Sequence, residues 1–412
     1  MINVNDCPGK TDNERIEYAI THRTPDGIVL LPPRESETEP ERTFWLLDRA
    51  VLLPENTVFI LQNCTVKLSD VCRDNFFRTA NCGMGIDCPV PIANITLRGE
   101  GRCVLLGADH PRSTGDSSKT LHDPCPYTDA DLIKYADWLT DEERRTGNIG
   151  FWTKHNHTFG TDAGKDGESQ CGDWRNIGVL FANCHDFTIE NLTITDAHGW
   201  AISLEACSAG TVSRIHFDAY MSKVIDGMRH NIENQDGLDL RNGCHDIIVS
   251  DITGHTGDDV VALTAIAGEY HAGGATGSTH VMPNDWDRRE RDIHDISVRG
   301  VAAASQLCFV VRLLAAGTHI YNIVIDNIID TSPKDDHGAT LLFGDGGGYG
   351  READDGIRRV AVSNVICGGK SGGVDVHTPL DGCTFTNVIA SPGHSDAFSP
   401  SREELLDGAV IR

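Results

Sequence analysis

Two acidic segments lie a short interval apart in the middle of the chain. Residues 234–239 read Asn-Gln-Asp-Gly-Leu-Asp, and residues 257–259 read Gly-Asp-Asp, so 22 residues separate Asp236 from Asp258. If that interval is one turn of a solenoid, the carboxylates stack on adjacent coils, about 4.8 Å apart. Carboxylates at that distance repel each other, so at least one of them should have a raised pKa. A neutral carboxylic acid beside a charged carboxylate can supply a general acid and a general base.

Such stacking requires a repeating fold, and a four-residue apolar–polar–polar–apolar unit does recur. Its copies are separated by 23, 37, 49, 27, 37 and 23 residues. The copies begin at Ile189, Val212, Val249, Val298, Ile325, Val362 and Phe385. A period of about 20 to 50 residues built from short strands is typical of repeat folds, and the Asn and Gly residues in the units suit tight turns. The pattern predicts an all-β protein, a right-handed parallel β-helix (solenoid); an antiparallel sandwich is the alternative.

The chain is expected to form one β-helix domain over residues 1–412. Residues 1–35 are predicted to cap one end, with a short helix near residues 13–22 and a buried strand near residues 27–31. The main coils, which carry the acidic segments, are expected over residues 176–390. Residues 107–174 interrupt the pattern and contain Trp138, Trp152 and Trp174. Long loops in compact proteins are usually functional or disordered, and the tryptophans and histidines of this region favour an ordered loop that covers a cleft.

The amino-acid composition limits the classes of molecule that the protein is expected to bind. The net charge of −26 argues against binding to nucleic acid or to anionic membranes. No apolar stretch approaches the roughly 18 residues of a membrane span, and the chain opens without a secretory signal, so a cytoplasmic location is expected. The 14 cysteines show no zinc spacing and are expected to be buried reduced thiols, six of them in or beside the repeats. These six are Cys184, Cys207, Cys244, Cys308, Cys367 and Cys383. No metal or other cofactor is predicted, and association into a homo-oligomer is possible for such a fold.

Several segments carry a resemblance to known enzymes. Residues 9–13 and 27–33 are similar to the opening of pectate-lyase-like β-helix enzymes. Residues 198–204, 234–239 and 257–263 resemble glycoside hydrolase family 28, the polygalacturonase family. The resemblance extends loosely over residues 4–68 and well over residues 176–263, and two acidic motifs at one-coil spacing make it specific. It implies that the carboxylates of both motifs carry the chemistry of glycosidic bond cleavage.

The resemblance assigns roles to the acidic residues. Asp259 is the candidate acid that protonates the leaving oxygen, and Asp236 and Asp258 are the candidate bases that activate water. Asp239 is expected to support the site, and Asn234 to orient a carboxylate or a substrate hydroxyl. These groups titrate as a coupled set, so the identity of the proton donor stays open at this stage.

Other residues are expected to line the cleft. His198 and Trp200 precede the acidic motifs by one coil, and Trp200 is either a sugar-stacking ring or a packed aromatic. The family's Gly-His-Gly strand is missing from residues 304–312, where His280 could substitute. The family's Arg-x-Lys pair, which resembles a clamp for a sugar carboxylate, is missing from residues 338–345. We therefore expect a substrate other than plain galacturonan, with Arg312 as a new anion or hydroxyl contact.

The predicted activity is hydrolysis of an oligosaccharide or polysaccharide by clustered aspartates. One alternative is a calcium-dependent polysaccharide lyase in which Arg312 or a lysine is the base. A second is a β-helix transglycosidase of the inulin-fructotransferase type, in which a substrate hydroxyl replaces water. A third is a carbohydrate-binding or structural β-helix like those of phage tail fibres. The sugar, its linkage, the stereochemical outcome and endo or exo action are open at this level.

Overall fold

The structure is a computed structural model of the whole chain. The structure describes residues 1–72, 74–83, 85–86, 88–110, 173–225, 228–231, 234–266, 281–282, 288–333, 338–344 and 356–412. Its described helices are α1 (Asp12–Thr21) and the short 3-10 helices η1 (Val4–Asp6), η3 (Asp173–Asn176), η5 (Arg288–Arg291) and η6 (Glu403–Leu406). All other regular elements in the described residues are strands, as the sequence predicted.

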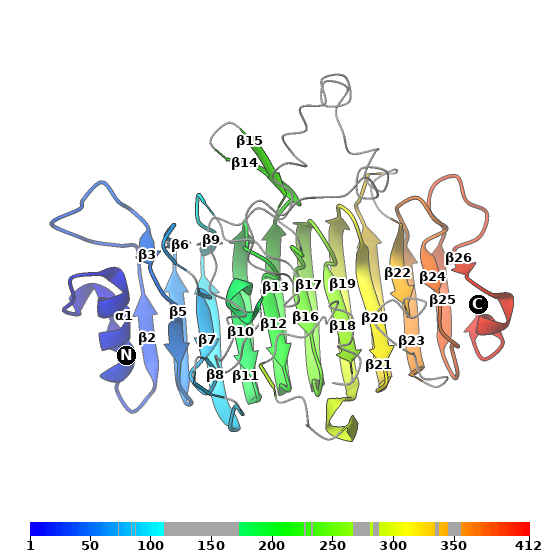
Figure 1. Cartoon of the computed structure of the whole chain (residues 1–412), viewed down its shortest axis with the longest axis horizontal. Coiled ribbons are helices and arrows are strands. Elements are labelled where there is room, and N and C mark those ends of the chain that lie inside the picture. The colour runs from blue at the N-terminus through cyan, green and yellow to red at the C-terminus, as the bar shows by residue number, and fades with distance from the viewer. Residues whose placement is uncertain are drawn as a thin grey trace.

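Two parallel sheets run the length of the molecule (Figure 1). Within the described residues, the larger sheet has 15 strands and the second sheet has 10. The larger sheet contains β1 (Ile2–Asn3), β2 (Ile28–Leu31), β3 (Trp45–Leu47), β5 (Thr57–Gln62), β6 (Thr65–Leu68), β8 (Ile92–Glu100), β9 (Val104–Leu106), β11 (Cys184–Thr195), β13 (Ser208–Asp218), β17 (His245–Thr256), β19 (Ile293–Ser305), β21 (Ile320–Asp330), β23 (Ile357–Ile366), β25 (Thr384–Ile389) and β27 (Val410–Ile411).

The second sheet contains β4 (Val51–Leu53), β7 (Phe77–Thr79), β10 (Val179–Ala182), β12 (Ile202–Glu205), β16 (Leu238–Leu240), β18 (Val261–Ile266), β20 (Phe309–Ala316), β22 (Ala339–Phe343), β24 (Val374–Val376) and β26 (Phe398–Pro400). From β10 to β26 the chain alternates between the two sheets, and each strand pairs in parallel with its counterpart on the next coil. This is the predicted right-handed parallel β-helix. Strands β14 (Ser222–Ile225) and β15 (Met228–Asn231) form a separate antiparallel hairpin.

The seven repeat units predicted from the sequence fall in register. Their first residues pair in succession from Ile189 to Phe385 along the larger sheet. The third residue of every unit has a positive φ, between 53° and 66°. These seven residues are Asn191, Arg214, Asp251, Gly300, Asn327, Asn364 and Asn387. The sequence led us to expect tight turns at these positions. Instead, each unit lies inside a long strand and contains one residue in the left-handed conformation, which Asn, Asp and Gly tolerate best.

A helix covers the N-terminal end of the coils (Figure 1). Helix α1 begins with a capping box in which the Thr11 side chain accepts from the Glu14 backbone N–H. Its residues Ile16 and Ala19 are fully buried in the core. The prediction of a helix near residues 13–22 and a strand near residues 27–31 is confirmed by α1 and β2. This helix shields apolar core that an open solenoid end would expose.

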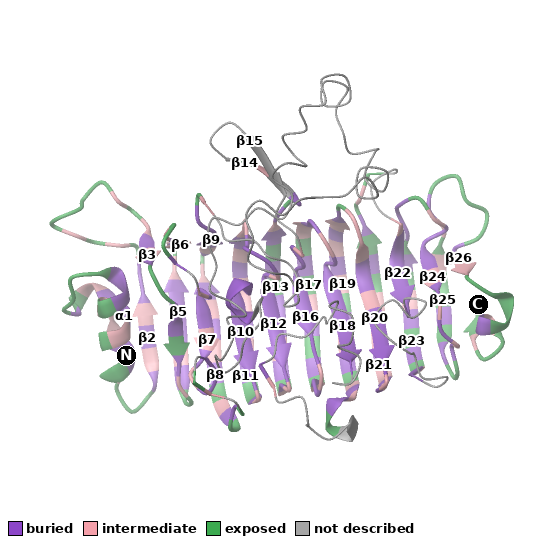
Figure 2. Cartoon of the chain, viewed as in Figure 1, coloured by how far each residue is buried: buried purple, intermediate pink, exposed green. Residues whose placement is uncertain are grey.

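Inward-facing apolar side chains form one core cluster that extends from Val4 to Leu405. Figure 2 shows this buried core along the strands, with exposed residues mainly in loops and at the two ends. Cysteines contribute to this core. Cys184, Cys207 and Cys244 are buried and free, and each lies one residue before a position that pairs with its counterpart on the next coil. Cys367 and Cys383 are also buried free thiols, as predicted, but Cys308 is only half-buried.

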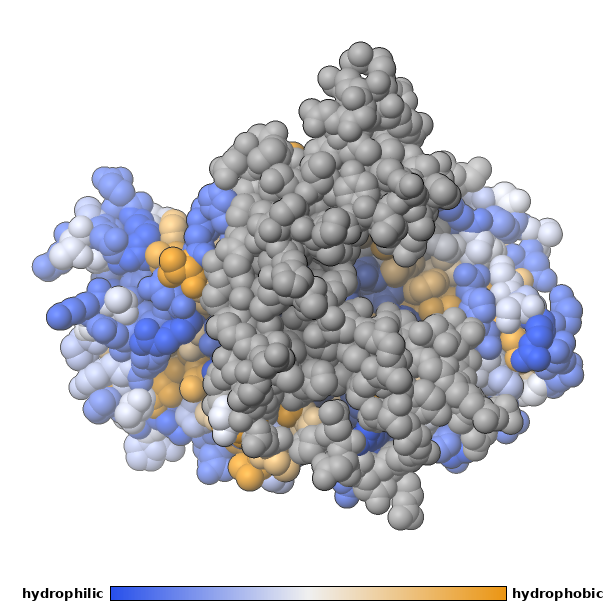
Figure 3. All heavy atoms as spheres, viewed as in Figure 1, coloured by the Kyte–Doolittle hydropathy of each residue, from blue (hydrophilic) through white to orange (hydrophobic). Residues whose placement is uncertain are grey.

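Most of the predicted loop region, residues 111–172, lies outside the described residues, as do Trp138 and Trp152. Trp174 is described and is almost fully buried, where it packs with Ile177, Leu180 and Val281. In Figure 3 the described surface at both ends of the molecule is mainly hydrophilic, with small hydrophobic patches between them. No helix in the part of the chain that the structure describes is long and apolar enough to span a membrane.

Candidate active site

The acidic motifs lie at the same corner of adjacent coils, just before strands β16 and β18. Leu238 pairs with Val261, so this coil advances 23 residues rather than the 22 counted from Asp236 to Asp258. The Gly237 N–H donates to the Asp259 carbonyl over 2.8 Å. The extended register therefore aligns Asp236 with Asp259. The expected stacking of Asp236 on Asp258 was wrong by one residue, because the buried apolar residues of the strands decide the register.

The following coil brings a thiol to the acidic pair. Val261 pairs with Val311, and the Val260 N–H donates to the Phe309 carbonyl over 2.9 Å. Extending this register places Cys308 beside Asp258. A carboxylate oxygen of Asp258, one of Asp259 and the Cys308 sulfur all lie within 4.8 Å of one another. Cys308 therefore occupies the coil on which the family resemblance led us to expect a histidine.

Asp259 is fully buried, with an exposed fraction of 0%. The Phe309 N–H donates to its Oδ1 over 3.0 Å, and Arg312 Nη1 donates to its Oδ2 over 3.0 Å. Burial raises the pKa of Asp259, the Arg312 guanidinium lowers it, and the charge of Asp258 raises it again, with a resulting pKa of about 6. A carboxyl with that pKa can hold a proton in mildly acidic solution and release it during a reaction.

Asp236 and Asp239 are also buried. The pKa of Asp236 is raised well above its ordinary value, first by burial and then by repulsion from Asp239, Asp258 and Asp259. Burial likewise raises the pKa of Asp239, although the nearby Arg241 guanidinium opposes the shift. Within the described residues, Oδ1 of Asp236 and Oδ2 of Asp239 have no hydrogen-bond partner. Such atoms are costly to bury, and they are typical of a site that completes its hydrogen bonds with a ligand.

Asp258 is the least buried of the four aspartates. Its backbone carbonyl accepts from Thr256 Oγ1 over 2.6 Å and from Ser305 Oγ over 2.8 Å. Its Oδ1 accepts from the Asp259 N–H over 3.1 Å. Burial and the adjacent Asp258 carboxylate raise the pKa of the Cys308 thiol well above its ordinary value, and a hydrogen bond to Asp258 contributes to this shift. The turn is thus held rigidly while its carboxylate stays accessible.

The other predicted site residues have different environments. His198 is buried and its Nε2 accepts from the Ala108 N–H over 2.9 Å, a contact that joins it to a neighbouring segment. Trp200 is half-buried, and the Arg241 guanidinium carbon lies 4.9 Å from its ring centroid. Asn234 is half-buried with a φ of 53°. His280 lies outside the described residues. The structure therefore brings the four aspartates and Arg312 together and places Trp200 beside Arg241.

Sequence reasoning missed the contributions of Cys308, Ser305 and Arg241. Arg241 follows Asp239 by two residues, so period-two alternation places both on the same face of the second sheet and could have identified it. Cys308 and Ser305 had no local signal, because they lie some 50 residues from the aspartates and reach them only through strand register.

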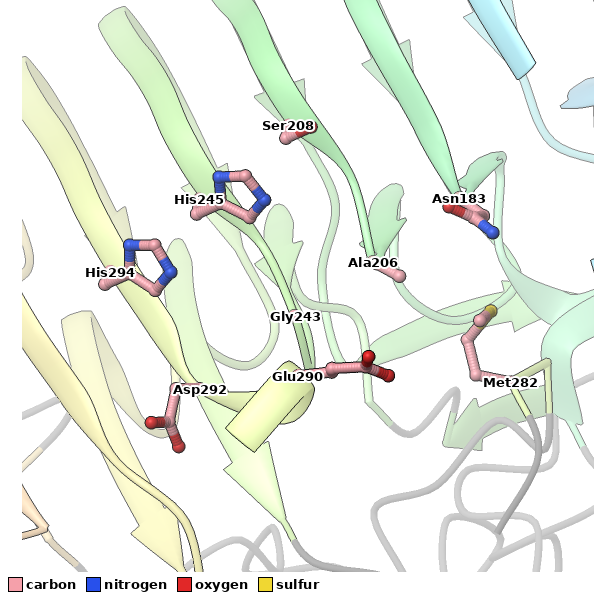
Figure 4. Close-up of a pocket in the computed structure, with 9 residues that line it drawn as sticks. All are labelled: Asn183, Ala206, Ser208, Gly243, His245, Met282, Glu290, Asp292 and His294. Atoms are coloured by element: carbon pink, nitrogen blue, oxygen red, sulfur yellow. The ribbon is translucent and has the colours of Figure 1, made fainter. Parts of the chain in front are cut away.

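Described residues line two cavities beside the coils. One, of about 490 Å³, has Thr256 and Ser305 in its wall and so adjoins the Asp258 turn. The other, of about 360 Å³, lies where strands of the larger sheet begin and includes His245 and His294, whose stacked rings are 4.9 Å apart (Figure 4). The second cavity contains none of the predicted catalytic residues.

Comparison with known proteins agrees with this geometry. Residues 161–279 match the model of Glycosyl hydrolases family 28. No curated protein sequence matches the chain. A tailspike protein mutant of Escherichia coli bacteriophage HK620, solved with a hexasaccharide, is similar in structure, with a TM-score of 0.51 and 12% sequence identity. That comparison covers 100% of this chain and 66% of the tailspike chain.

Two further solved structures are similar at lower scores. The family 28 exopolygalacturonase of Yersinia enterocolitica has a TM-score of 0.45 and 10% identity, over 100% of this chain and 77% of that chain. The endo-xylogalacturonan hydrolase of Aspergillus tubingensis has a TM-score of 0.46 and 11% identity, over 98% of this chain and 95% of that chain. The fold and the clustered carboxylates define the chain as a parallel β-helix enzyme. More particularly, both acidic motifs lie within residues 161–279, the part of the chain that matches the family 28 model.

Proposed function

We propose that the protein hydrolyses an oligosaccharide by general acid–base catalysis with its clustered aspartates. The observation that carries this proposal is the alignment of Asp236 with Asp259 on adjacent coils, with Asp258 beside them. The environments differ: Asp259 is buried with a pKa of about 6, whereas Asp258 is half-buried. Carboxyl groups whose environments separate their pKa values are suited to opposite roles in one reaction.

The roles follow from these environments. Asp259 donates its proton to the glycosidic oxygen as the bond to the leaving sugar breaks. The half-buried Asp258 takes a proton from a water molecule whose oxygen bonds to the anomeric carbon, whereas Asp236, the other candidate base, is less suited to that role because its pKa is raised. The hydrogen bonds from Phe309 and Arg312 hold the Asp259 carboxyl in one orientation and stabilise the carboxylate that remains. Asp239 and Asn234 support and orient the site in this scheme.

The substrate is proposed to be an oligosaccharide other than plain galacturonan. In the described strands, β22 places Leu342 in the register position next to Arg312 and β24 places Asp375 in the one after it, so neither position holds a second cation. A calcium-dependent lyase is less consistent with the site, because calcium prefers six to eight oxygen ligands. Here a thiol stands among the clustered donors, and Asp259 already accepts from Arg312.

The experiment uses wild type, Asp258→Asn and Asp259→Asn on a panel of oligosaccharides in ¹⁸O-labelled water, read by mass spectrometry with and without a chelator. Hydrolysis predicts one ¹⁸O atom per cleaved bond, loss of product in both variants and no effect of the chelator. Asp251→Asn is the matched control, because Asp251 is exposed and its φ of 57° suits asparagine. Cyclised unlabelled products would indicate a transglycosidase, and unsaturated chelator-sensitive products would indicate a lyase; either would contradict the proposal.

A further inference from the structure

The cavity beside the Asp258 turn has a lining of mixed chemistry. Its volume is about 490 Å³, and it lies over the ends of strands β17, β19 and β21. The lining residues are Tyr220, Gly254, His255, Thr256, Ala302, Ala304, Ser305, Gln306, Thr331 and Pro333. Thr256 and Ser305 each donate a side-chain hydrogen bond to the Asp258 carbonyl. Thr256 and Ser305 therefore line the cavity and also hold the turn that carries Asp258 in the candidate active site.

An aromatic ring stands at the edge of this cavity in a fixed position. Tyr220 is 51% exposed, and its ring centroid lies 3.8 Å from that of His255. His255 is itself held from both sides, because its Nδ1 lies 2.9 Å from the Ala219 carbonyl and its Nε2 lies 3.2 Å from Asp218. An exposed aromatic ring that is fixed from behind can bind the apolar face of a sugar with little loss of conformational entropy.

The rest of the lining is small or polar. Ala302 and Ala304 contribute only small side chains to the lining. Gln306 is oriented by the Met221 N–H, which donates to its Oε1 over 3.0 Å. Gln306 and Thr331 are exposed and offer amide and hydroxyl groups at the rim, as hydroxyl-rich ligands require.

The charges of the lining residues further limit the class of sugar that the cavity can bind. Among the residues that the structure describes, the lining includes no Lys, Arg, Asp or Glu, and its one basic ring, His255, already faces the Asp218 carboxylate. A uronate would find no unpaired cation among the described lining residues and would meet a protein whose net charge is −26. A neutral pentose or hexose fits the lining without burying an uncompensated charge.

We propose that this cavity is a subsite for a neutral sugar unit attached to the sugar that is cleaved at Asp258 and Asp259. The inference rests on the proposed hydrolase function for its place in the substrate, but binding in the cavity can be measured separately. The substrate class is then an oligosaccharide with a neutral unit that reaches over the turn from the cleaved bond.

The test measures binding before cleavage. Saturation-transfer NMR and calorimetry with the Asp258→Asn protein compare neutral pentose and hexose oligosaccharides with oligogalacturonates. We expect a neutral oligosaccharide to bind and Tyr220→Ala to weaken its Kd about tenfold or more, whereas Tyr220→Phe keeps the ring and most of the affinity. Tyr18→Ala is the matched control, because Tyr18 is 38% exposed and stacks on His22 at 3.9 Å, on helix α1. Absence of binding by every neutral sugar, or binding that Tyr220→Ala leaves unchanged, would overturn the subsite.

Cleavage assays separate this inference from the proposed function. If wild type hydrolyses a neutral-unit oligosaccharide, Tyr220→Ala should lower kcat/KM on that substrate and leave cleavage of an aryl glycoside, which lacks the unit, unchanged. Equal loss on both substrates would contradict the subsite while leaving hydrolysis established. Tyr220-dependent binding without any hydrolysis would support the subsite and contradict the proposed function.

Discussion

The Arg312 guanidinium donates a hydrogen bond over 3.0 Å to Asp259, from strand β20 to the turn that precedes β18. The two residues are 53 positions apart in the chain, and the Asp259 side chain is fully buried. Arg312 opposes the rise in the Asp259 pKa that burial produces. The contact therefore decides the pH range over which the candidate acid is protonated.

Replacement of Arg312 should move the basic limb of the activity profile. A general acid works in its protonated form, so activity with Asp259 as donor falls as pH rises through its pKa of about 6. Arg312→Met removes the favourable charge, and we expect the limb to shift upward by about one pH unit or more. Arg312→Lys should shift it less. The profile of kcat against pH measures this, and an unmoved limb in Arg312→Met would exclude Asp259 as the acid.

Replacement of Asp236 should stabilise the protein while abolishing its activity. The folded-state pKa of Asp236 is raised above 3.8, so its stabilising contribution is present below that value and is lost as pH rises toward the folded pKa. Asp236→Asn avoids this loss, and we expect about 1 kcal/mol or more of added unfolding free energy at pH 7. The gain should shrink toward pH 4. Urea unfolding at several pH values tests this, with Asp251→Asn as a control; a destabilised variant at pH 7 would contradict it.

The Cys308 thiol should act through its contact with Asp258. Hydrogen bonds to charged groups contribute about 1.5–3 kcal/mol, so we expect Cys308→Ala to lower kcat about tenfold or more and Cys308→Ser to retain most of it. Both variants should unfold at temperatures near that of wild type, because the side chain is only half-buried. Steady-state kinetics and thermal melts measure the two effects. Equal activity in the alanine and serine variants would show that the contact has no catalytic consequence.

The ion cluster beside helix α1 should affect stability alone. Asp12 accepts from Arg34 Nε over 3.0 Å and pairs with Arg42, and the Asp12 and Arg34 side chains are 2% and 3% exposed. Asp12→Asn removes the buried counter-charge and leaves Arg34 and Arg42 paired only with the exposed Glu39, and we expect a loss of about 3–5 kcal/mol. Asp26→Asn, in an exposed pair with the N-terminus, should change little. Chemical unfolding measures both, and equal effects would show that the buried cluster does not stabilise the cap.

The repeat units illustrate how far sequence reasoning reaches. Ile189 pairs with Val212, and Val212 pairs with Val249 on the next coil. Both pairings follow from buried apolar residues that recur at the same position of each coil. The same reasoning placed the acidic motifs at one corner but missed the alignment of Asp236 by one residue. The number of residues between two aspartates does not reveal how the strands pair. The pairing of Leu238 with Val261 does, and it sets the alignment of Asp236.

The sequence by itself determined the class of fold, the approximate location of the acidic cluster and the absence of the family's histidine and Arg-x-Lys pair. These properties depend on residue types and on periodicity, both of which are local. Only the tertiary structure decided that Cys308 lies beside Asp258, that Arg312 pairs with Asp259, and that a cavity edged by Tyr220 adjoins their turn. Those relationships join segments that are 38 to 53 residues apart in the chain. Because the inserted segments differ in length from coil to coil, separation along the chain does not determine distance in space.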